Sequence, residues 1–368
     1  MRMLDFRRRL HKHPELSFKE HNTQQFIIEA LHNEGIPYRT IAETGVLAVI
    51  EGKRGNHERA VVLRADIDAL PIEELNNIEY RSENKGVMHA CGHDMHAAIL
   101  FGVLQSLNRE RNFEGTLFGI FQPGEELNPG GASLVLKEEP FVGYDVAAVI
   151  GEHVDASLEV GEVGICPGRF MASNDEIRFK ISGCGGHAAR RKEIDDTVTA
   201  MADMVVRTTA LNSPNGVVSI GRIIADGATN VIPSVVTAEG TMRTFDNEER
   251  ERIYTHLNGN ARIIAEKYGV EVDVDINRGY PCVVNDVMLS YEAMIIASDE
   301  GITVRELQPL TTAEDFGYYT ERYPSLFYRL GVGRNAGGSH TATFCPDEAA
   351  LEVGKRMMQR MALHILNK

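Results

Sequence analysis

The chain has 368 residues, which predicts two domains rather than a single core. Its net charge of −15 is unlike that of a nucleic-acid-binding protein, and no apolar run is long enough to span a membrane. The N-terminus lacks the apolar stretch of a secretory signal, and the five cysteines are scattered. We therefore expect a cytoplasmic protein without disulfides.

Helices and apolar strands alternate in the first part of the chain. Predicted helices span residues 4–11, 21–33 and 97–107, and predicted strands span 45–50, 60–65, 116–121 and 146–150. Such alternation indicates an α/β domain whose mostly parallel sheet is flanked by helices on both faces.

Polar clusters follow three of these predicted strands. Asp66 and Asp68 come after the second, Glu125 and Glu126 after the third, and His153 after the fourth. In open α/β sheets, sites form at the carboxyl ends of the strands. The sequence therefore predicts a site at this edge of the sheet.

The pattern changes between residues 170 and 283. Strands are predicted at 176–182, 217–224, 234–242 and 270–276, and helices at 195–211 and 247–268. This βαββαβ order is that of a ferredoxin-like unit. We expect it to be a separate domain, inserted into a first domain that comprises residues 1–169 and 284–368.

The first domain's pattern resumes after the insertion. A helix is predicted over 284–298, and another opens at 311–316, where Thr311 and Glu314 have capping-box spacing. A strand at 325–330 leads into a glycine-rich loop that holds His340. The closing helix is predicted over 346–366, with Pro346 in its first turn.

The stretch His89-Ala90-Cys91-Gly92-His93-Asp94-Met95-His96 indicates a metal site. Cys91 and His93 are two apart, so both side chains can face one centre in a loop. Thiolate, imidazole and carboxylate together suit a divalent transition metal. Alone, such a pair is more often a buried thiol and a surface histidine. The ligand types at the nearby strand ends favour the metal interpretation.

Two further groups complete the predicted site. Glu125 and Glu126 are adjacent after an apolar strand, so one carboxylate can bind metal while the other acts as a base toward water. His153 and His340 add two imidazoles. The resulting five ligands suffice for two metals if the Cys91 thiolate bridges, and a single-metal site remains an alternative.

His187 lies among glycines at the end of the inserted domain's first strand. It is either an ordinary turn histidine or a side chain that stabilises an oxyanion.

Seven motifs carry a resemblance to a known family. They are His89-Ala90-Cys91-Gly92-His93-Asp94, Gln122-Pro123-Gly124-Glu125-Glu126, Gly185-Gly186-His187-Ala188, Asn230-Val231-Ile232-Pro233, Gly240-Thr241-Met242-Arg243-Thr244, Ala313-Glu314-Asp315-Phe316 and Ser339-His340. Over essentially its whole length the chain resembles the metal-dependent amidohydrolases of the aminoacylase type. The branch is that of hippurate hydrolase, indole-acetyl-amino-acid hydrolase and N-acetyl-diaminopimelate deacetylase.

The resemblance implies a zinc-peptidase-like catalytic domain with an inserted ferredoxin-like lid that also forms a homodimer. It implies two divalent ions per subunit (Mn, Zn, Co or Ni), a small N-acyl amino acid as substrate, and hydrolysis of its amide bond. The implied roles are as follows: Cys91 as bridging ligand; His93, Glu126, His153 and His340 as the other ligands; Glu125 as general base; His187 as oxyanion stabiliser in the partner's site; Asn230 and Arg243 beside the substrate carboxylate; Asp68 behind a ligand histidine.

Several alternatives stay open at this point. A dipeptidase or aminopeptidase could use the same scaffold, Cys91 could be the nucleophile of a cysteine hydrolase, and the chain could bind metal without catalysis. One departure from the family bears on substrate choice. Arg191 and Lys192 replace a usual Pro-His pair, which makes the lid loop more basic and favours an acidic substrate.

Overall fold

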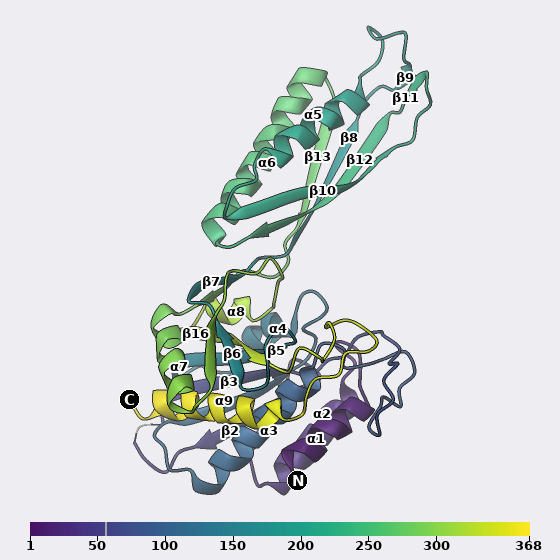
Figure 1. Ribbon diagram of the computed structural model, residues 1–368. Coiled ribbons are helices and arrows are strands. Elements are labelled where there is room, and N and C mark those ends of the chain that lie inside the picture. Colours follow the sequence, from purple (N-terminus) through teal and green to yellow (C-terminus); the bar gives the residue numbers. More distant parts are fainter. Residues whose placement is uncertain (56) are drawn as a thin grey trace. The chain divides into compact units, whose positions relative to one another are not determined.

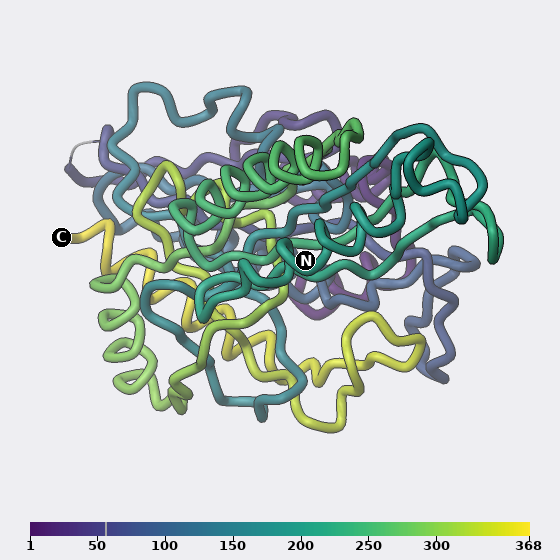
Figure 2. The backbone as a smooth tube through the Cα atoms, turned by 90° about the horizontal axis from the view of Figure 1, so that it is seen from above, coloured from purple at the N-terminus to yellow at the C-terminus, as the bar shows by residue number. Residues whose placement is uncertain are grey.

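The computed structural model describes residues 1–55 and 57–368 and contains two compact units. Unit 1 comprises Met1–Gly168, Val284–Gln308 and Asp315–Lys368; unit 2 comprises Arg169–Val283 and Pro309–Glu314. In Figures 1 and 2 the chain of unit 1 runs from purple to blue and returns from green to yellow, and unit 2 is the teal and green segment between.

Unit 1 is built on an eight-stranded sheet in the order β1-β2-β4-β3-β5-β16-β6-β15. The strands are β1 (Tyr38–Ile41), β2 (Gly45–Glu51), β3 (Arg59–Asp66), β4 (Thr116–Gln122), β5 (Asp145–Asp155), β6 (Glu162–Ile165), β15 (Thr303–Glu306) and β16 (Ser325–Gly331). The neighbours β4, β3, β5 and β16 are parallel to one another. The predicted α/β class with a mostly parallel sheet is confirmed.

Helices cover both faces of this sheet (Figure 1). They are α1 (Met3–Lys12), α2 (His21–Asn33), α3 (His93–Glu110), α4 (Gly131–Lys137), α7 (Val287–Asp299), α8 (Gly317–Thr320) and α9 (Ala350–Leu366). Helices α3 and α9 pack together against β3 and β5, and their buried apolar side chains join those of α1 in one large core. Helices α4 and α8 contact each other and lie against β4 and β16, respectively.

Unit 2 has the element order βαββαβ. It contains β8 (Asp175–Ser182), α5 (Thr197–Thr209), β10 (Gly216–Ala225), β12 (Val235–Thr244), α6 (Asn247–Tyr268) and β13 (Glu271–Asn277), with the short pair β9 (Gly186–His187) and β11 (Val231–Ile232). The four long strands are antiparallel in the order β10-β12-β8-β13. Two further short strands, β7 (Gly168–Met171) and β14 (Val283–Asn285), lie where the chain changes units.

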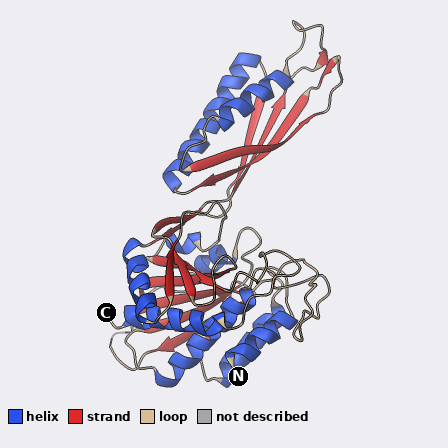
Figure 3. Ribbon diagram, viewed as in Figure 1, coloured by secondary structure: helices blue, strands red, loops and turns tan. Residues whose placement is uncertain are grey.

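One face of the unit 2 sheet carries α5 and α6 (Figure 3). Strand β8 alternates strictly, so Ile177, Phe179 and Ile181 enter a core shared with both helices, while the residues between them are exposed. Asp196 and Asp246 cap the two helices, since each carboxylate accepts a backbone N–H of the first turn.

Four predicted boundaries are wrong. Helix α7 begins at Val287 instead of residue 284, because residues 283–285 form β14 and Asp286 caps the helix. Helix α3 begins at His93 instead of residue 97, because Gly92 at φ 90° turns the chain directly into the helix. Residues 311–316 do not open a helix: Asp315 binds Arg64 and Gln122 in the core, and α8 starts only at Gly317. The closing helix begins at Ala350, and Pro346 lies in the preceding loop.

Segment 309–314 also differs from the predicted division, since it lies in unit 2, where Leu310 and Thr312 accept the Ala172 N–H. Among the described residues, no helix combines the length and apolar character that crossing a bilayer requires.

Candidate metal centre

The predicted ligands of unit 1 come together at one edge of its sheet. Four adjacent parallel strands (β4, β3, β5 and β16) end at this edge. Glu125 and Glu126 follow β4, Asp68 follows β3, His153 lies near the end of β5, and the loop after β16 carries His340. Cys91 and His93 enter at the start of α3. Parallel pairing thus gathers side chains that are far apart in sequence.

The buried Cys91 sulfur is the centre of the cluster. It lies 3.2 Å from His153 Nε2 and 3.3 Å from His340 Nε2. The same His340 nitrogen is 3.2 Å from Glu126 Oε1. Burial raises the pKa of the Cys91 thiol to about 12, so the sulfur becomes a thiolate only when a cation lies beside it.

Asp68 lies behind His93 and fixes the orientation of its ring. His93 Nδ1 faces the Asp68 backbone oxygen at 2.9 Å and its carboxylate at 3.1 Å, so Nδ1 carries a hydrogen and Nε2 is the nitrogen that faces the cluster. Burial lowers the pKa of His93, but Asp66, Cys91 and Asp68 together raise it well above its ordinary value, so Nε2 becomes a ligand when a cation takes the place of its proton. Burial alone would raise the pKa of Asp68, but hydrogen bonds from His93, the Glu126 N–H and Ser17 lower it below its ordinary value. The carboxylate is therefore ionised, as an orienting group requires.

His153 is held in the corresponding tautomer. Its Nδ1 faces the Val154 carbonyl at 2.8 Å, which leaves Nε2 to face Cys91. Burial and the nearby Arg329 lower the pKa of His153 well below its usual range. The ring is therefore neutral and can act as a ligand.

His96 has a structural role, because both of its ring nitrogens form hydrogen bonds within the protein. The Val154 N–H donates to His96 Nε2 at 2.9 Å, and His96 Nδ1 donates to Asp66 at 2.6 Å. Both ring nitrogens are occupied, so His96 supports the site without facing its centre.

The adjacent carboxylates Glu125 and Glu126 both face His93. One oxygen of Glu125 is 4.0 Å from His93 Nε2, and one oxygen of Glu126 is 3.9 Å from it. Glu125 is the more buried of the two. Two carboxylates thus lie near the Nε2 atom of His93.

The donor set fits a divalent transition metal. Ligand atoms of Cys91, His93 and His153 lie within 4.8 Å of one another, as do those of Cys91, Glu126 and His340. His93 Nε2 is buried, and no hydrogen bond satisfies it within the described part of the chain. Glu126 Oε1 is also buried, and its neighbour is the ligand candidate His340. Buried ligand atoms that converge on a thiol in this way are expected where a cation binds.

A second set of residues supports the site, and the sequence analysis identified Asp66 among them but missed Arg64. Arg64 is fully buried in β3 and reaches Asp66 at 2.6 Å, Asp315 at 2.7 Å and Gln122 at 3.1 Å. Asp66 in turn holds His96. The available signal was a charged residue in the middle of an otherwise apolar strand.

The remaining predicted site residues lie in unit 2, at opposite ends of its sheet. His187 on β9 pairs with Val231, next to Asn230, and both His187 and Asn230 are exposed. Arg243 is half-buried near the end of β12, where it donates to the Ser173 carbonyl and lines a depression of about 350 Å³. The structure therefore groups His187 with Asn230 and separates both from Arg243.

The positive charge of the loop around Arg191 is partly compensated within unit 2. Arg191 binds Asp196 at 2.6 Å, and Arg190 lies 3.5 Å from Glu193. These exposed pairs weaken the argument for an acidic substrate, because part of the loop's positive charge already has local partners.

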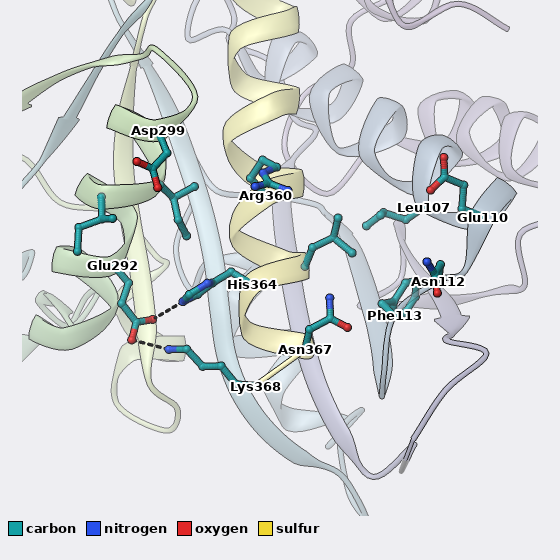
Figure 4. A pocket seen from close by; sticks show the side chains of 13 residues that line it. Leu107, Glu110, Asn112, Phe113, Glu292, Asp299, Arg360, His364, Asn367 and Lys368 are labelled. Carbon is teal, nitrogen blue, oxygen red and sulfur yellow. Dashed lines mark hydrogen bonds and ion pairs between the residues drawn. The ribbon is translucent and has the colours of Figure 1, made fainter.

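A cavity of about 660 Å³ lies away from the ligand cluster (Figure 4). It is lined by the C-terminal end of α3 and by parts of α7 and α9, where Glu292 pairs with His364 and Lys368. Leu107 in its wall is fourteen residues after His93, or about 21 Å along the helix axis. None of the predicted site residues lines this cavity.

Comparisons with known proteins agree with this site. N-acetylcysteine deacetylase of Bacillus subtilis is 36% identical over 374 residues, covering 99% of this chain and 97% of that protein. N-acetyldiaminopimelate deacetylase of Exiguobacterium sibiricum is 35% identical over 359 residues, covering 95% of each. A solved Bacillus subtilis protein, described as a dinuclear metal binding peptidase, has a TM-score of 0.88 at 35% identity and covers 99% of this chain and 97% of its own.

A family model agrees with the resemblance seen in the sequence. Residues 62–364 match the model described as Peptidase family M20/M25/M40. That span contains all the candidate ligands, the whole of unit 2 and most of unit 1. The predicted family is confirmed, and the chain belongs to Peptidase family M20/M25/M40.

Proposed function

We propose that this protein is a metal-dependent amidohydrolase that cleaves the amide bond of N-acyl amino acids. The observation that carries the proposal is the convergence of Cys91, His93, Glu126, His153 and His340 beside a second carboxylate, Glu125. The deacetylases that share 35–36% identity over nearly the whole chain support this substrate class.

The five ligands are suited to two ions. The triplets Cys91-His93-His153 and Cys91-Glu126-His340 share the sulfur, and a thiolate can bridge. The solved relative described as dinuclear supports this count. When bound, such ions lower the pKa of water and polarise a carbonyl. The donor set accepts Mn, Zn, Co or Ni.

Glu125 is the proposed general base. Its carboxylate is buried next to the ligand histidine His93 and can take a proton from a water in the site. The same oxygen can then return that proton to the leaving amide nitrogen. The retained base also argues against a protein that only binds metal.

The proposed lid is unit 2, whose βαββαβ order is ferredoxin-like. His187 is proposed to stabilise the oxyanion, and Asn230 and Arg243 to bind the substrate carboxylate. Arg243 lies eight residues from Val235 along β12, roughly 26 Å, whereas His187 and Asn230 lie beyond the other end of that strand. One small substrate cannot span this length, which supports His187 and Asn230 acting together on a substrate in the partner subunit, apart from Arg243 of their own chain.

A homodimer through the lid is proposed on the same grounds. The edge strand β13 carries Glu271, Asp273 and Asp275, which discourage pairing with another strand. The opposite edge strand, β10, exposes Ile223 and Ile224 instead. We place the dimer contact at β10.

A cytoplasmic location stays a prediction from the five free cysteines.

A hydrolysis screen tests the function. The purified protein is stripped with a chelator, reloaded with Mn²⁺, Co²⁺, Ni²⁺ or Zn²⁺, and offered N-acetyl, N-benzoyl and N-succinyl amino acids together with dipeptides. We expect metal-dependent release of the amino acid from an N-acyl substrate. Preference for dipeptides would indicate a dipeptidase, and full activity after complete metal removal would indicate catalysis by the Cys91 thiol.

A further inference from the structure

A cluster of buried charged groups lies beneath the start of α3, outside the ligand set. Arg7 and His11 come from α1, Glu74 from the loop after β3, and Asp94 from the first turn of α3, and all four are at most 2% exposed. Arg7 Nε lies 2.7 Å from Asp94. The proposed reaction uses none of these residues directly.

His11 joins two carboxylates within this cluster. Its Nδ1 is 2.9 Å from Asp94, and its Nε2 is 3.2 Å from Glu74. Both carboxylates are acceptors, so a ring that donates to both of them carries a positive charge. Arg7 Nη2 also lies 3.4 Å from Nδ1. Burial lowers the pKa of His11, but Asp94 and Glu74 together raise it above its ordinary value.

The contact between His11 and Asp94 bears on the position of the proposed ligand His93. Asp94 directly follows His93, and α3 begins at His93, so the anchored carboxylate fixes the first turn of the helix. A displacement of this turn would move the His93 ring away from Asp68, which orients it.

The Glu74 side leads to another proposed ligand. The residues after Glu74 hold the loop that carries His340: the Leu75 N–H donates to the Ala342 carbonyl at 2.8 Å, and Asn76 donates to the Phe344 carbonyl at 3.0 Å. His340 is 53% exposed and has a φ of 62°, so its position depends on such contacts more than on core packing.

We propose that His11 is a positioning residue that couples the His93 helix to the His340 loop and thereby sets the spacing of the metal ligands. The inference rests on the proposed metal-dependent function, but it concerns residues that do not touch metal or substrate. Supporting residues of this kind typically change metal affinity by about 10- to 100-fold.

Three variants separate the two sides of the bridge. His11→Asn keeps a donor near Nδ1 for Asp94 and loses Glu74, His11→Gln keeps a donor near Nε2 for Glu74 and loses Asp94, and His11→Leu loses both. His13→Gln is the matched control, because His13 is on the same segment, is partly exposed and contacts neither carboxylate. Co²⁺ affinity is measured by chelator competition, and the Co²⁺ absorption spectrum reports thiolate ligation.

We expect about 10-fold weaker Co²⁺ binding in His11→Asn and His11→Gln, a larger loss in His11→Leu, and wild-type binding in His13→Gln. Far-UV circular dichroism and thermal unfolding show whether each variant is folded. If His11→Leu does not fold, the Co²⁺ affinities of His11→Asn and His11→Gln test the proposal. Wild-type affinity and spectrum in folded amide variants would overturn the proposal, whatever their thermal stability. Failure of wild-type protein to bind Co²⁺ through a thiolate would instead contradict the proposed function.

Discussion

At the residue scale, the site depends on two adjacent glutamates with different neighbours. Glu126 is 3.2 Å from His340, and its backbone N–H donates to the Asp68 carboxylate. Glu125 is more deeply buried and lies beside His93. Adjacent residues in a turn point in different directions, so one carboxylate can hold metal while the other meets water. Their roles should therefore be separable by substitution.

Glu125→Gln should retain bound metal and lose about 10²- to 10⁴-fold in kcat, because the amide cannot accept a proton. Glu126→Gln should lose metal first, because a ligand is removed. Metal content after dialysis and steady-state kinetics with saturating metal distinguish the two. Glu159→Gln, an exposed surface change, is the control. A Glu125→Gln enzyme within tenfold of wild-type kcat would remove Glu125 from the role of base.

At the element scale, β3 illustrates why a strand cannot be interpreted from its apolar residues alone. Its sequence predicts a buried strand, and that prediction is confirmed. The strand also carries Arg64, whose partner Asp315 is 251 residues away in sequence. Such a pair is not detectable by periodicity, since it depends on which elements the sheet brings together.

Arg64→Met should destabilise the protein by about 3–5 kcal/mol, because Asp66 and Asp315 would lose their shared buried cation. The double variant Arg64→Met with Asp315→Asn should recover part of this loss. Arg59→Met in the same strand is the matched control, since Arg59 is partly exposed and donates to the Ile365 backbone carbonyl. Urea unfolding of the metal-free proteins measures the differences, and equal losses for Arg59 and Arg64 would contradict this account.

At the scale of the whole molecule, the sequence predicted more of the chemistry than of the architecture. Alternation of elements predicted the α/β class. The stretch 89–96 predicted Cys91, and the polar residues after strands predicted Glu125 and His153, which the structure brings to the same edge of the sheet. The strand order was not predictable, because β16 pairs with β5 across about 170 intervening residues. Short elements such as α4 and β15 were also missed, since few residues carry too little periodicity.

The proposed division of labour between two subunits leads to the last prediction. If His187 acts on the partner's site, Glu125→Gln and His187→Ala homodimers should each be nearly inactive. After subunit exchange, a mixed dimer contains one site with an intact Glu125 and an intact partner His187. Random exchange makes half of the dimers mixed, so about a quarter of wild-type activity should return.

The mirror experiment distinguishes this outcome from contamination or simple stabilisation. Wild-type subunits exchanged with the double variant Glu125→Gln/His187→Ala should lose activity, because each wild-type site then faces a partner without His187. Native mass spectrometry confirms that mixed dimers have formed. If the mixed dimers of the first experiment stay inactive while those of the second keep one active site each, His187 serves its own subunit. The 26 Å separation along β12 would then require Arg243 to act elsewhere than at the substrate carboxylate.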